Sequence, residues 1–456
     1  MKKYSLKLIL AFLICCLAQS TKAQMNVTWA DTLNKLLVKV QGDENMQGLA
    51  AGVVFSDGST WSSAAGYHGT VPLSKDFLYD IGSNTKSMVA SIILLLEEES
   101  KLSINDTLYQ HIAPVPNVPF GITIKQLLGH RSGVFNYTTH PNFINEINTN
   151  DTKFWHPDSI LSTFLSSPDF APGTNYNYSN TGYILLGKVI EAIENKPLNQ
   201  VLKTRIFTPM SLDSTYLDQY DPYTLTKTGA WLSPTLYFPN NFISFMSSAW
   251  AAGAVVSTPK DFAEYAHNLF SGQLLSAASL QKMQLGTNLV GSSTYGLGII
   301  KWGYRGKTYL GHGGTTLQNS EMEYSVTSGF SLVLMNLDNG FFNETARAKL
   351  KLIDLLEYIE DVQANGMGLA NNLKAEIEVS AYPNPSADYI TFDLKTENEV
   401  NNITLEILDI AGRKVMETST ANSTLTLRKE TAGTGIFFAR ILADNQWVKT
   451  ERIVFN

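Results

Sequence analysis

The alternation of apolar and polar residues divides the chain into a long region of mixed patterns and a shorter region of strand patterns. Apolar positions recur at helical spacing over 29–40, and residues 48–55 and 60–67 flank an Asp57-Gly58 turn, which predicts a β-hairpin. Residues 87–96 are apolar nearly all round, which is typical of a helix buried at the centre of a domain. Further helices are predicted over 124–128, 183–195, 261–270 and 346–360, and a buried strand over 330–337.

Short alternating segments follow one another towards the end of the chain, separated by turn residues such as Pro383-Asn384-Pro385. These segments cover residues 389–394, 403–410, 424–427, 436–442 and 448–454. They predict a small all-β sandwich over 379–456. The stretch 361–378 before it is rich in Gly and Asn and lacks a stable period, which predicts a linker, so the main domain of mixed α+β type would span 24–360.

The first residues have the pattern of a secretory signal peptide over 1–23. Lys2, Lys3 and Lys7 precede a short apolar run, and Ala23 closes a small-residue cleavage site. The run is too short for a stable membrane span, although a retained N-terminal anchor is the alternative. No apolar run of spanning length follows, so no transmembrane segment is expected in the mature form. Cleavage would remove both cysteines of the chain, which excludes disulfides and a Cys nucleophile.

Composition and missing motifs narrow the function classes. The net charge of −7, from 34 basic and 41 acidic residues, argues against a nucleic-acid partner, because phosphate binding needs a basic face. The seven histidines are scattered without a zinc-protease motif, and no phosphate or dinucleotide loop occurs, so no metal or organic cofactor is expected. The nucleophile-elbow motif of α/β-hydrolases is also absent.

A serine followed three residues later by a lysine is a candidate pair of nucleophile and base, because at helical spacing the amine can reach the hydroxyl. The chain holds this tetrad three times, as Ser83–Lys86, Ser257–Lys260 and Ser279–Lys282. The second contains a proline and fits a helix N-cap, and the third lies in a polar stretch where the lysine would be solvated. Only Ser83 begins a helix whose following turns are apolar, where Lys86 would lose water and with it basicity. Ser83 is therefore the predicted nucleophile.

Three motifs in order resemble those of the serine β-lactamase and penicillin-binding protein superfamily. They are Tyr79-Asp80-Ile81-Gly82-Ser83-Asn84-Thr85-Lys86, Tyr178-Ser179-Asn180 with its flanks, and His312-Gly313-Gly314-Thr315. The branch that the chain resembles holds class C β-lactamases, D-alanyl-D-alanine carboxypeptidases, D-aminopeptidases and esterases. The resemblance covers roughly residues 29–360. It implies a β-lactamase/transpeptidase-like fold, with an antiparallel sheet flanked by helices beside a helical subdomain.

The resemblance also implies roles for the motif residues. Ser83 would attack the substrate carbonyl and form an acyl-enzyme, while Lys86 and Tyr178 share the proton, with Tyr178 as a phenolate base or both residues as a relay. Asn180 would orient the substrate amide. The backbone N–H groups of Ser83 and Thr315 would form an oxyanion hole, beside Gly314 of the same strand. The implied partner is a small-molecule or peptide-like substrate, hydrolysed at an ester or amide bond.

Two positions depart from the pattern of the superfamily. His312 stands where class C β-lactamases carry lysine, and an ordinary histidine would make turnover change between about pH 5.5 and 7.5. Gly313 stands where a hydroxyl often helps to hold a substrate carboxylate. Its absence favours esters, or amides without a free carboxylate next to the scissile bond.

Other interpretations stay open from the sequence. A D-alanyl-D-alanine carboxypeptidase, a penicillin-binding protein or a weak β-lactamase would use the same motifs. A non-catalytic cell-wall-binding relative would keep them without turnover. Taken singly, Tyr178-Ser179-Asn180 fits a turn with a packed phenol, and His312 fits an ordinary strand histidine; His130 and Arg131 are expected to be structural.

The last domain resembles the C-terminal sorting domain of type IX secretion cargo. The resemblance rests on Tyr382-Pro383-Asn384-Pro385, Leu408-Asp409-Ile410-Ala411-Gly412-Arg413 and Gly435-Ile436-Phe437-Phe438. It implies contact with the secretion machinery and export through the periplasm to the outer cell surface or the medium. A carbohydrate-binding or adhesive β-sandwich is the alternative.

Overall fold

The computed structural model describes residues 27–456, apart from 234–235, 239–241, 287, 291–292, 365–376, 397–401, 411–412, 421, 423 and 444–445. The predicted signal peptide, 1–23, lies outside the described residues. None of the helices in the described residues has both the length and the hydropathy that a membrane crossing requires.

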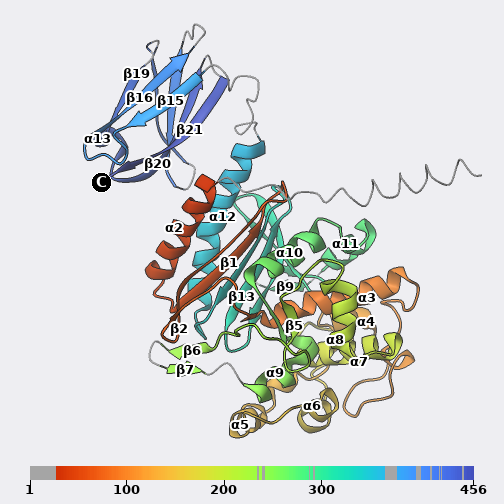
Figure 1. Ribbon diagram of the computed structural model, residues 1–456. Helices are drawn as coiled ribbons and strands as arrows, with labels where there is room; N and C mark the ends of the chain where they lie inside the picture. The colour runs from red at the N-terminus through yellow and green to blue at the C-terminus, as the bar shows by residue number, and fades with distance from the viewer. Residues whose placement is uncertain are drawn as a thin grey trace, which may run out of the picture.

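A nine-stranded antiparallel sheet forms the centre of the main domain (Figure 1). Its strands, in spatial order, are β3 (Val71–Pro72), β2 (Thr60–His68), β1 (Gly48–Val54), β14 (Ser331–Asn336), β13 (Asn319–Ser325), β12 (Lys307–Thr315), β11 (Ile300–Tyr304), β10 (Ser293–Tyr295) and β9 (Asn288–Val290). The predicted hairpin is confirmed, since β1 and β2 pair around the Asp57-Gly58 turn with Val54 opposite Thr60. β11 pairs with β12 only as far as Gly311, so the last residues of β12 lie at an open edge.

Helices cover both faces of this sheet. On one face α2 (Val27–Asp43) and α12 (Phe342–Ala364) lie side by side and bury leucines such as Leu37 and Leu356 against it. On the other face α10 (Pro259–Phe270) packs against β1 and β14. The amphipathic patterns explain this arrangement, because each helix presents one apolar stripe to the sheet.

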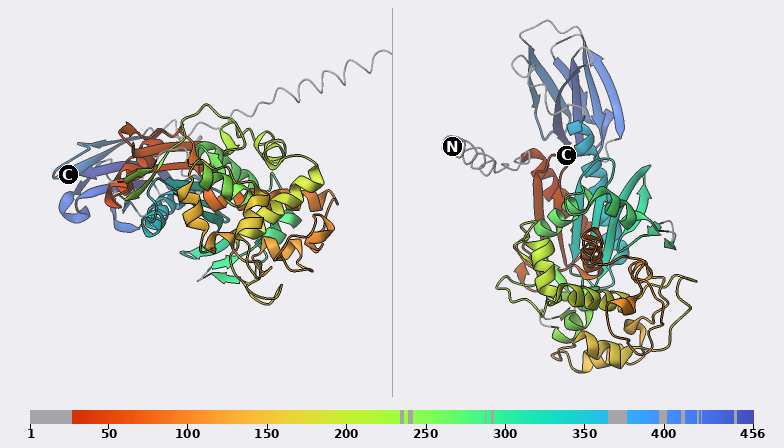
Figure 2. Two further views of the ribbon diagram at one scale, coloured as in Figure 1. Left: turned by 90° about the horizontal axis from the view of Figure 1, so that it is seen from below. Right: turned by 90° about the vertical axis from the view of Figure 1, so that its right-hand side faces the viewer.

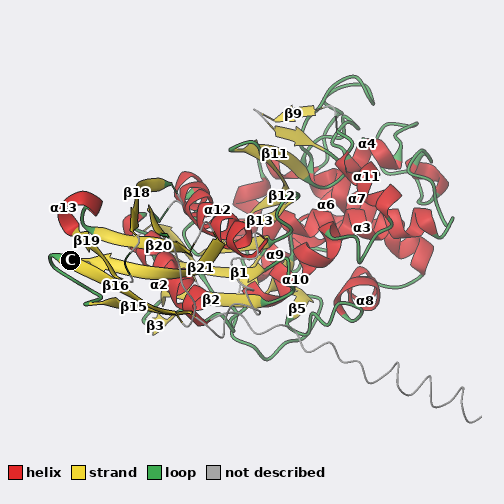
Figure 3. Ribbon diagram, turned by 90° about the horizontal axis from the view of Figure 1, so that it is seen from above, coloured by secondary structure: helices red, strands yellow, loops and turns green. Residues whose placement is uncertain are grey.

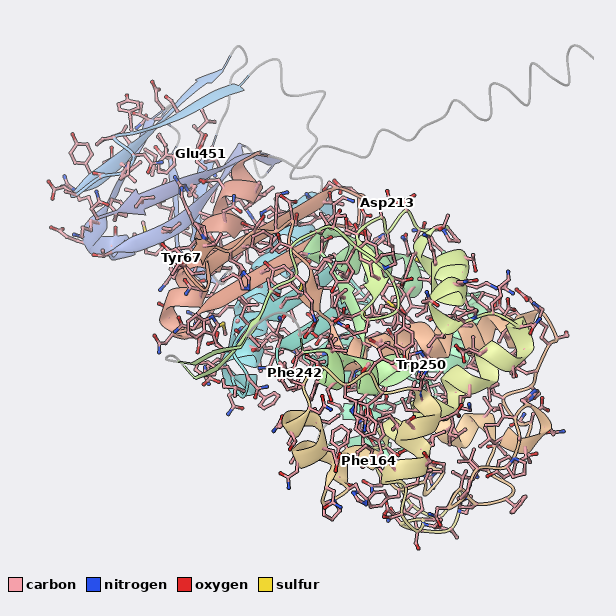
Figure 4. The ribbon with its side chains drawn as sticks, turned by 60° about the horizontal axis from the view of Figure 1, so that its bottom comes forward. Tyr67, Phe164, Asp213, Phe242, Trp250 and Glu451 are labelled. Atoms are coloured by element: carbon pink, nitrogen blue, oxygen red, sulfur yellow. The ribbon has the colours of Figure 1, made fainter. Side chains whose placement is uncertain are left out.

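A helical region adjoins the sheet, and Figure 3 shows its helices gathered at one end of the molecule. It is built around α3 (Thr85–Glu98), whose side chains are almost all buried, as its continuous apolar pattern predicts. The surrounding elements are α4 (Ile124–Leu128), α5 (Phe143–Thr149), α6 (Pro157–Phe164), α7 (Asn180–Glu194), α8 (Leu198–Leu202), α9 (Ile243–Ala249) and α11 (Ala277–Gln284), with small sheets β4 (Tyr79–Asp80), β8 (Val255–Ser257) and β5 (Thr215–Leu217), and β6 (Ala230–Ser233) and β7 (Leu236–Phe238). Figure 4 labels Phe164 and Trp250 within this region, and both are buried in its core.

The C-terminal residues form two antiparallel sheets that enclose a separate apolar core, beyond α12 in Figure 2. One sheet has the order β15 (Ile377–Tyr382), β16 (Tyr389–Thr396), β19 (Thr424–Arg428), and the other β18 (Lys414–Thr420), β17 (Ile403–Leu408), β20 (Gly435–Ala443), β21 (Gln446–Phe455), with a short helix α13 (Lys429–Ala432). The Phe438 ring lies 5.8 Å from that of Trp29 and 5.4 Å from that of Tyr358, and so packs against the main domain. The predicted α+β fold followed by a small all-β part is confirmed.

The closing helix and the C-terminal strands differ from the sequence prediction. The closing helix α12 begins at Phe342 and continues to Ala364, and β15 begins at Ile377, so both ends of the predicted 361–378 linker have regular structure. Residues 365–376 lie outside the described residues, and their role as a linker stays a prediction. β15 and β18 were not predicted, because the exposed residues of β18 and the prolines after β15 hide their alternation.

Candidate active site

Ser83 lies in a short 3₁₀ turn, Gly82–Asn84, that leads from β4 into α3. Gly82 has φ +52°, and a Cβ there would stand 2.7 Å from the backbone nitrogen of Thr315, so only glycine fits. The Asn84 side chain donates to the Ile81 carbonyl at 3.0 Å and to Ser320 Oγ at 2.9 Å. The turn is thus fastened to β13 and lies against the end of β12.

Lys86 lies one turn further along and is fully buried. Its Nζ donates to Ser83 Oγ at 3.0 Å and to the carbonyl of Ala252 at 2.5 Å. In the described part of the chain no carboxylate lies within ion-pairing distance of this amine. Burial without a counter-charge lowers the pKa of Lys86 well below its ordinary value.

Tyr178 comes from a distant part of the chain, two residues before α7, and its hydroxyl lies close enough to the Ser83 side chain to interact with it. Lys86 Nζ lies 5.0 Å from the centre of the Tyr178 ring. Loss of water around the hydroxyl raises the pKa of Tyr178 well above its ordinary value, and the interaction with Ser83 offsets only part of this. The three predicted groups are therefore together, with the proton expected on the phenol rather than on the amine.

His312 faces the same site from β12, in a chain of hydrogen bonds that fixes its tautomer. The Ser179 backbone N–H donates to His130 Nδ1 at 3.2 Å, so a neutral His130 carries its proton on Nε2, which lies 3.0 Å from the Tyr295 hydroxyl. The Tyr295 hydroxyl can then donate to His312 Nε2 at 3.1 Å, while His312 Nδ1–H bonds the Gly313 carbonyl. Every hydrogen bond in this network therefore pairs one donor with one acceptor.

The expected titration of His312 near neutrality is wrong for this structure. Burial, reinforced by the nearby Lys86, lowers the pKa of His312 to about 3. A proton on Nε2 would also face the Tyr295 hydroxyl with a second donor, because His130 already donates to it. His312 therefore stays neutral between about pH 5.5 and 7.5.

Tyr295 and His130 are the members of the site that the sequence analysis missed or set aside. Tyr295 lies on the short strand β10, outside all three motifs, and no local pattern distinguishes it. His130 was expected to be structural, yet its ring lies 4.2 Å from the ring of Tyr178. The only signal was the sequence around it, Leu127-Leu128-Gly129-His130-Arg131-Ser132-Gly133, which itself resembles a further landmark of the superfamily.

The third motif brings backbone groups to Ser83. Gly314 is opposite Ser320 in the β12–β13 ladder, and a Cβ on Gly314 would stand 2.1 Å from the Ile81 carbonyl and 2.3 Å from Ser320 Oγ. Only a residue without a side chain lets β12 approach the turn that holds Ser83 so closely. The Thr315 N–H is thereby carried next to Gly82.

An open cavity of about 280 Å³ lies along this edge of the sheet. Its lining residues are Tyr178, Ile300, His312, Gly313, Gly314, Thr315, Asn319, Ser320, Glu321, Phe342 and Thr345. Ser83 is partly exposed, whereas Lys86 is fully buried. The nucleophile thus meets solvent while its amine partner does not.

Asn180 heads α7, and its contacts are with the neighbouring loop. Its backbone N–H donates to Asn136 Oδ1 at 3.0 Å and its Nδ2 to Thr138 Oγ1 at 3.2 Å. Among the described residues no hydrogen bond joins Asn180 to Ser83 or Lys86. Its predicted role towards substrate stays a prediction.

The two rejected tetrads have structural roles. Ser257 is buried and its Oγ lies 2.7 Å from Thr215 Oγ1, while Thr258 caps α10 by accepting from the Asp261 N–H. Lys282 of α11 pairs with Glu97 at 2.9 Å. In the described ranges, no group of three or more His, Cys, Asp or Glu side chains is placed to hold a metal ion.

Comparison with known proteins supports the same interpretation for both parts of the chain. Residues 33–353 match the family model described as Beta-lactamase, and residues 380–456 match the Secretion system C-terminal sorting domain. A penicillin-binding protein of Bacillus subtilis is 27% identical over 252 residues, which cover 50% of this chain and 53% of that protein. The chain thus spans about half the length of the first curated relatives.

Solved structures share the architecture of the main domain. A D-stereospecific amidohydrolase from Streptomyces is 25% identical, with a TM-score of 0.60 over 69% of this chain and 95% of that one. A D-amino acid amidase from Ochrobactrum anthropi, 22% identical with a TM-score of 0.63 over 74% of this chain and 99% of that one, shares the fold.

The matched family segment runs from α2 to α12, and it contains the Ser83 turn and the strand of the third motif. It covers well over half of the chain. The chain therefore belongs to the beta-lactamase family of serine hydrolases, and it ends in a secretion-system sorting domain.

Proposed function

We propose that the chain is an exported serine hydrolase that cleaves ester or peptide-like amide bonds through an acyl-enzyme on Ser83. The observation that carries this proposal is the position of Ser83 Oγ, which lies 3.0 Å from the buried Lys86 amine, with the Tyr178 hydroxyl close beside it. A nucleophilic serine needs a neighbouring base, and a desolvated amine supplies one.

In the acylation step Ser83 Oγ bonds to the substrate carbonyl carbon and its proton passes to the neutral amine of Lys86. The lowered pKa of Lys86 keeps its lone pair available for this transfer. The Ala252 carbonyl, 2.5 Å from Nζ, holds the amine in place and accepts a hydrogen bond from the ammonium that forms.

The negative charge that develops on the carbonyl oxygen requires two donors. The backbone N–H of Ser83, at the start of the turn into α3, is one, and the N–H of Thr315 at the open end of β12 is the other. Loss of one such donor typically lowers the rate about 10²–10³-fold.

Tyr178 connects the amine with the departing group. As a phenol it donates its proton to the leaving oxygen or nitrogen and regains one from Lys86, so the carbon–leaving-group bond breaks without a free anion. Water then attacks the Ser83 ester, its proton passes to Lys86, and Ser83 Oγ leaves with a proton. Asn180 is the proposed contact for the substrate amide.

The substrate class is inferred from the third motif and from the relatives. Gly313 offers no hydroxyl to a substrate carboxylate, which favours esters, or amides without a carboxylate near the scissile bond. The Streptomyces relative is described as a D-stereospecific amidohydrolase, in agreement with amide substrates. The sorting domain supports release to the outer cell surface or the medium through the secretion machinery.

A fluorophosphonate probe tests the proposal. It is expected to label the wild-type protein, to leave Ser83→Ala unlabelled, and to label Ser279→Ala like the wild type, since Ser279 belongs to another Ser-x-x-Lys tetrad. A panel of p-nitrophenyl esters, nitrocefin and D-amino-acid peptides then measures turnover. A folded wild-type protein that takes no label would refute the proposal and favour a non-catalytic binding protein; label from a penicillin that is never released would indicate a cell-wall sensor.

A further inference from the structure

A carboxylate forms one wall of the cavity at Gly313. Gly313 and Glu321 are directly opposite in the β12–β13 ladder and so share one face of the sheet. The two Glu321 carboxylate oxygens lie 3.6 and 3.7 Å from the position that a Cβ on Gly313 would take. The space left by the missing side chain is therefore bordered by a negative charge.

The nearest cation does not neutralise this wall fully. Lys349 of α12 binds Glu321 Oε2 at 3.0 Å and also Glu323 Oε1 at 2.7 Å, so one ammonium is shared by two carboxylates. The Glu323 carboxylate is buried behind the wall and also accepts from Trp302 Nε1 at 2.6 Å. Glu321 is the only charged residue among those that line the described cavity.

Burial makes the Glu323 carboxyl harder to ionise than an exposed one. It raises the pKa of Glu323 above its ordinary value, although the charge of Lys349 acts to lower it. When Glu323 is protonated at lower pH, the Lys349 ammonium pairs with Glu321 alone. When Glu323 is ionised at higher pH, Glu321, Glu323 and Lys349 together carry a net negative charge. A cation that arrives in the cavity favours the second state.

The first turn of α12 carries a partial positive charge, which opposes the negative charge of Glu321 but is weaker. Phe342 and Thr345 line the cavity, and a helix N-terminus carries about half a positive charge. Glu344 lies in that same turn and bonds Arg347 at 2.9 Å, which offsets the helix field. A full carboxylate on the wall outweighs this partial charge.

The third motif links Glu321 to the proposed substrate site at Ser83. Gly313 lies two residues before Thr315, roughly 7 Å along the strand, and the Thr315 N–H is the proposed donor to the reacting carbonyl. A substituent a few bonds away from the scissile carbonyl therefore reaches the wall. Phe342, which is 53% exposed, gives the same wall an apolar and cation-binding surface.

We infer that Glu321 determines specificity, selecting substrates that carry an ammonium group near the scissile carbonyl and rejecting those that carry a carboxylate there. This inference rests on the proposed hydrolase function and names its substrate class. Where related sites gain affinity from a substrate carboxylate, this one would repel it.

Two matched substrate series test the inference. In the first, the leaving group varies: acetate esters of choline, of 3,3-dimethylbutanol and of 3-hydroxypropanoate carry a cation, no charge and an anion. In the second, the acyl group varies: p-nitroanilides of D- and L-alanine carry a cation, their N-acetyl forms carry no charge, and their N-succinyl forms carry an anion. We expect the wild type to favour the cation over the anion in kcat/KM in at least one series.

Glu321→Gln should reduce the cation-to-neutral ratio of kcat/KM about tenfold in that series, because one nearby charge is removed. Glu344→Gln is the matched control: it removes a carboxylate from the first turn of α12, beside the cavity but not lining it and not paired with Lys349, and the ratio should stay within about threefold. The wild-type ratio should also fall as salt is raised, which tests the charge effect without any variant.

The outcomes separate the two proposals. Hydrolysis that persists in Ser83→Ala, or a wild type that hydrolyses no substrate, overturns the proposed function and this inference with it. If Ser83→Ala abolishes hydrolysis but the wild type prefers the anion in both series, or Glu321→Gln leaves every ratio unchanged, only the inference about Glu321 is overturned. An equal shift in Glu344→Gln would assign the effect to the general field of the surrounding charges and overturn it too.

Discussion

Lys86 Nζ and Ser83 Oγ lie 3.0 Å apart in a place where the amine has no carboxylate partner within the described residues. Lys227, equally buried in the same domain, lies 3.1 Å from Asp80 and 2.7 Å from Asp218. Burial therefore has opposite outcomes: the pKa of Lys86 is lowered, and the pKa of Lys227 is raised by its two carboxylates. One lysine is prepared to accept a proton, and the other holds two segments together.

Replacement of these lysines should separate activity from stability. Lys86→Met is expected to lower kcat/KM about 10²–10⁴-fold, because the general base is lost. It should leave the melting temperature unchanged or raise it, since a desolvated amine becomes an apolar side chain. Lys227→Met leaves Asp80 and Asp218 buried without their cation and should cost about 3–5 kcal/mol in the free energy of unfolding.

Both variants are measured by thermal melts and by hydrolysis of a p-nitrophenyl ester. An active Lys86→Met enzyme would contradict the assignment of Lys86 as base. A Lys227→Met protein as stable as the wild type would show that the two acids take up protons at no cost.

The pH dependence of turnover should come from Lys86 and not from His312. The neutral amine is the active form, so kcat/KM should rise with pH as Lys86 loses its proton and fall as pH drops below its lowered pKa. His312, whose pKa is about 3, stays neutral throughout the range between about pH 5.5 and 7.5. His312→Asn should lower the rate without moving the inflection of the profile. A wild-type inflection that disappears in His312→Asn would restore the histidine as the titrating group.

The sequence predicts the parts of the site that depend on local spacing. Ser83 and Lys86 are three residues apart at the start of a helix, and helical geometry alone brings them together. Tyr178 could be placed only through the resemblance of its motif, since 95 residues separate it from Ser83. Strands β1, β2 and β14 and the buried helix α3 were likewise predicted from their periodicity, whereas the other strands of the sheet were not.

What the sequence could not predict depends on burial and on long-range pairing. The pKa of His312 is set by water exclusion and by the nearby Lys86, and no motif records how deeply the ring is buried. Glu321 became notable only when the β12–β13 register placed it opposite Gly313. A register across two strands has no signature in either strand alone.

Two neighbouring glycines of β12 should respond differently to the same added methyl group. A Cβ on Gly314 would stand 2.1 Å from the Ile81 carbonyl, so Gly314→Ala must push β12 away from the Ser83 turn. We expect about 10²-fold or greater loss of kcat/KM, because the Thr315 donor moves with the strand. On Gly313 the Cβ meets only Glu321 atoms, at 3.6 Å or beyond, so Gly313→Ala should fold with wild-type stability.

Melting temperatures and ester hydrolysis compare the pair. An active Gly314→Ala enzyme would contradict the proposed oxyanion site. A Gly313→Ala protein that unfolds readily would contradict the open space at that position.

Tyr295→Phe should expose the role of the hydrogen-bond chain between the two histidines. The hydroxyl accepts from His130 and donates to His312, so its removal leaves both ring nitrogens unpaired in a buried place. The cost is expected to be about 1–3 kcal/mol in the free energy of unfolding. The hydrogen bond that stabilises neutral His312 is lost as well, so its pKa should rise from about 3 and turnover should fall at acid pH.

Tyr265→Phe is the control, because it deletes another buried hydroxyl, 3.0 Å from Ser87 Oγ, that touches neither histidine. NMR titration of the histidine ring protons, together with pH–rate profiles, should show the shift in Tyr295→Phe alone; an unmoved His312 in that variant would mean that burial by itself keeps the ring neutral.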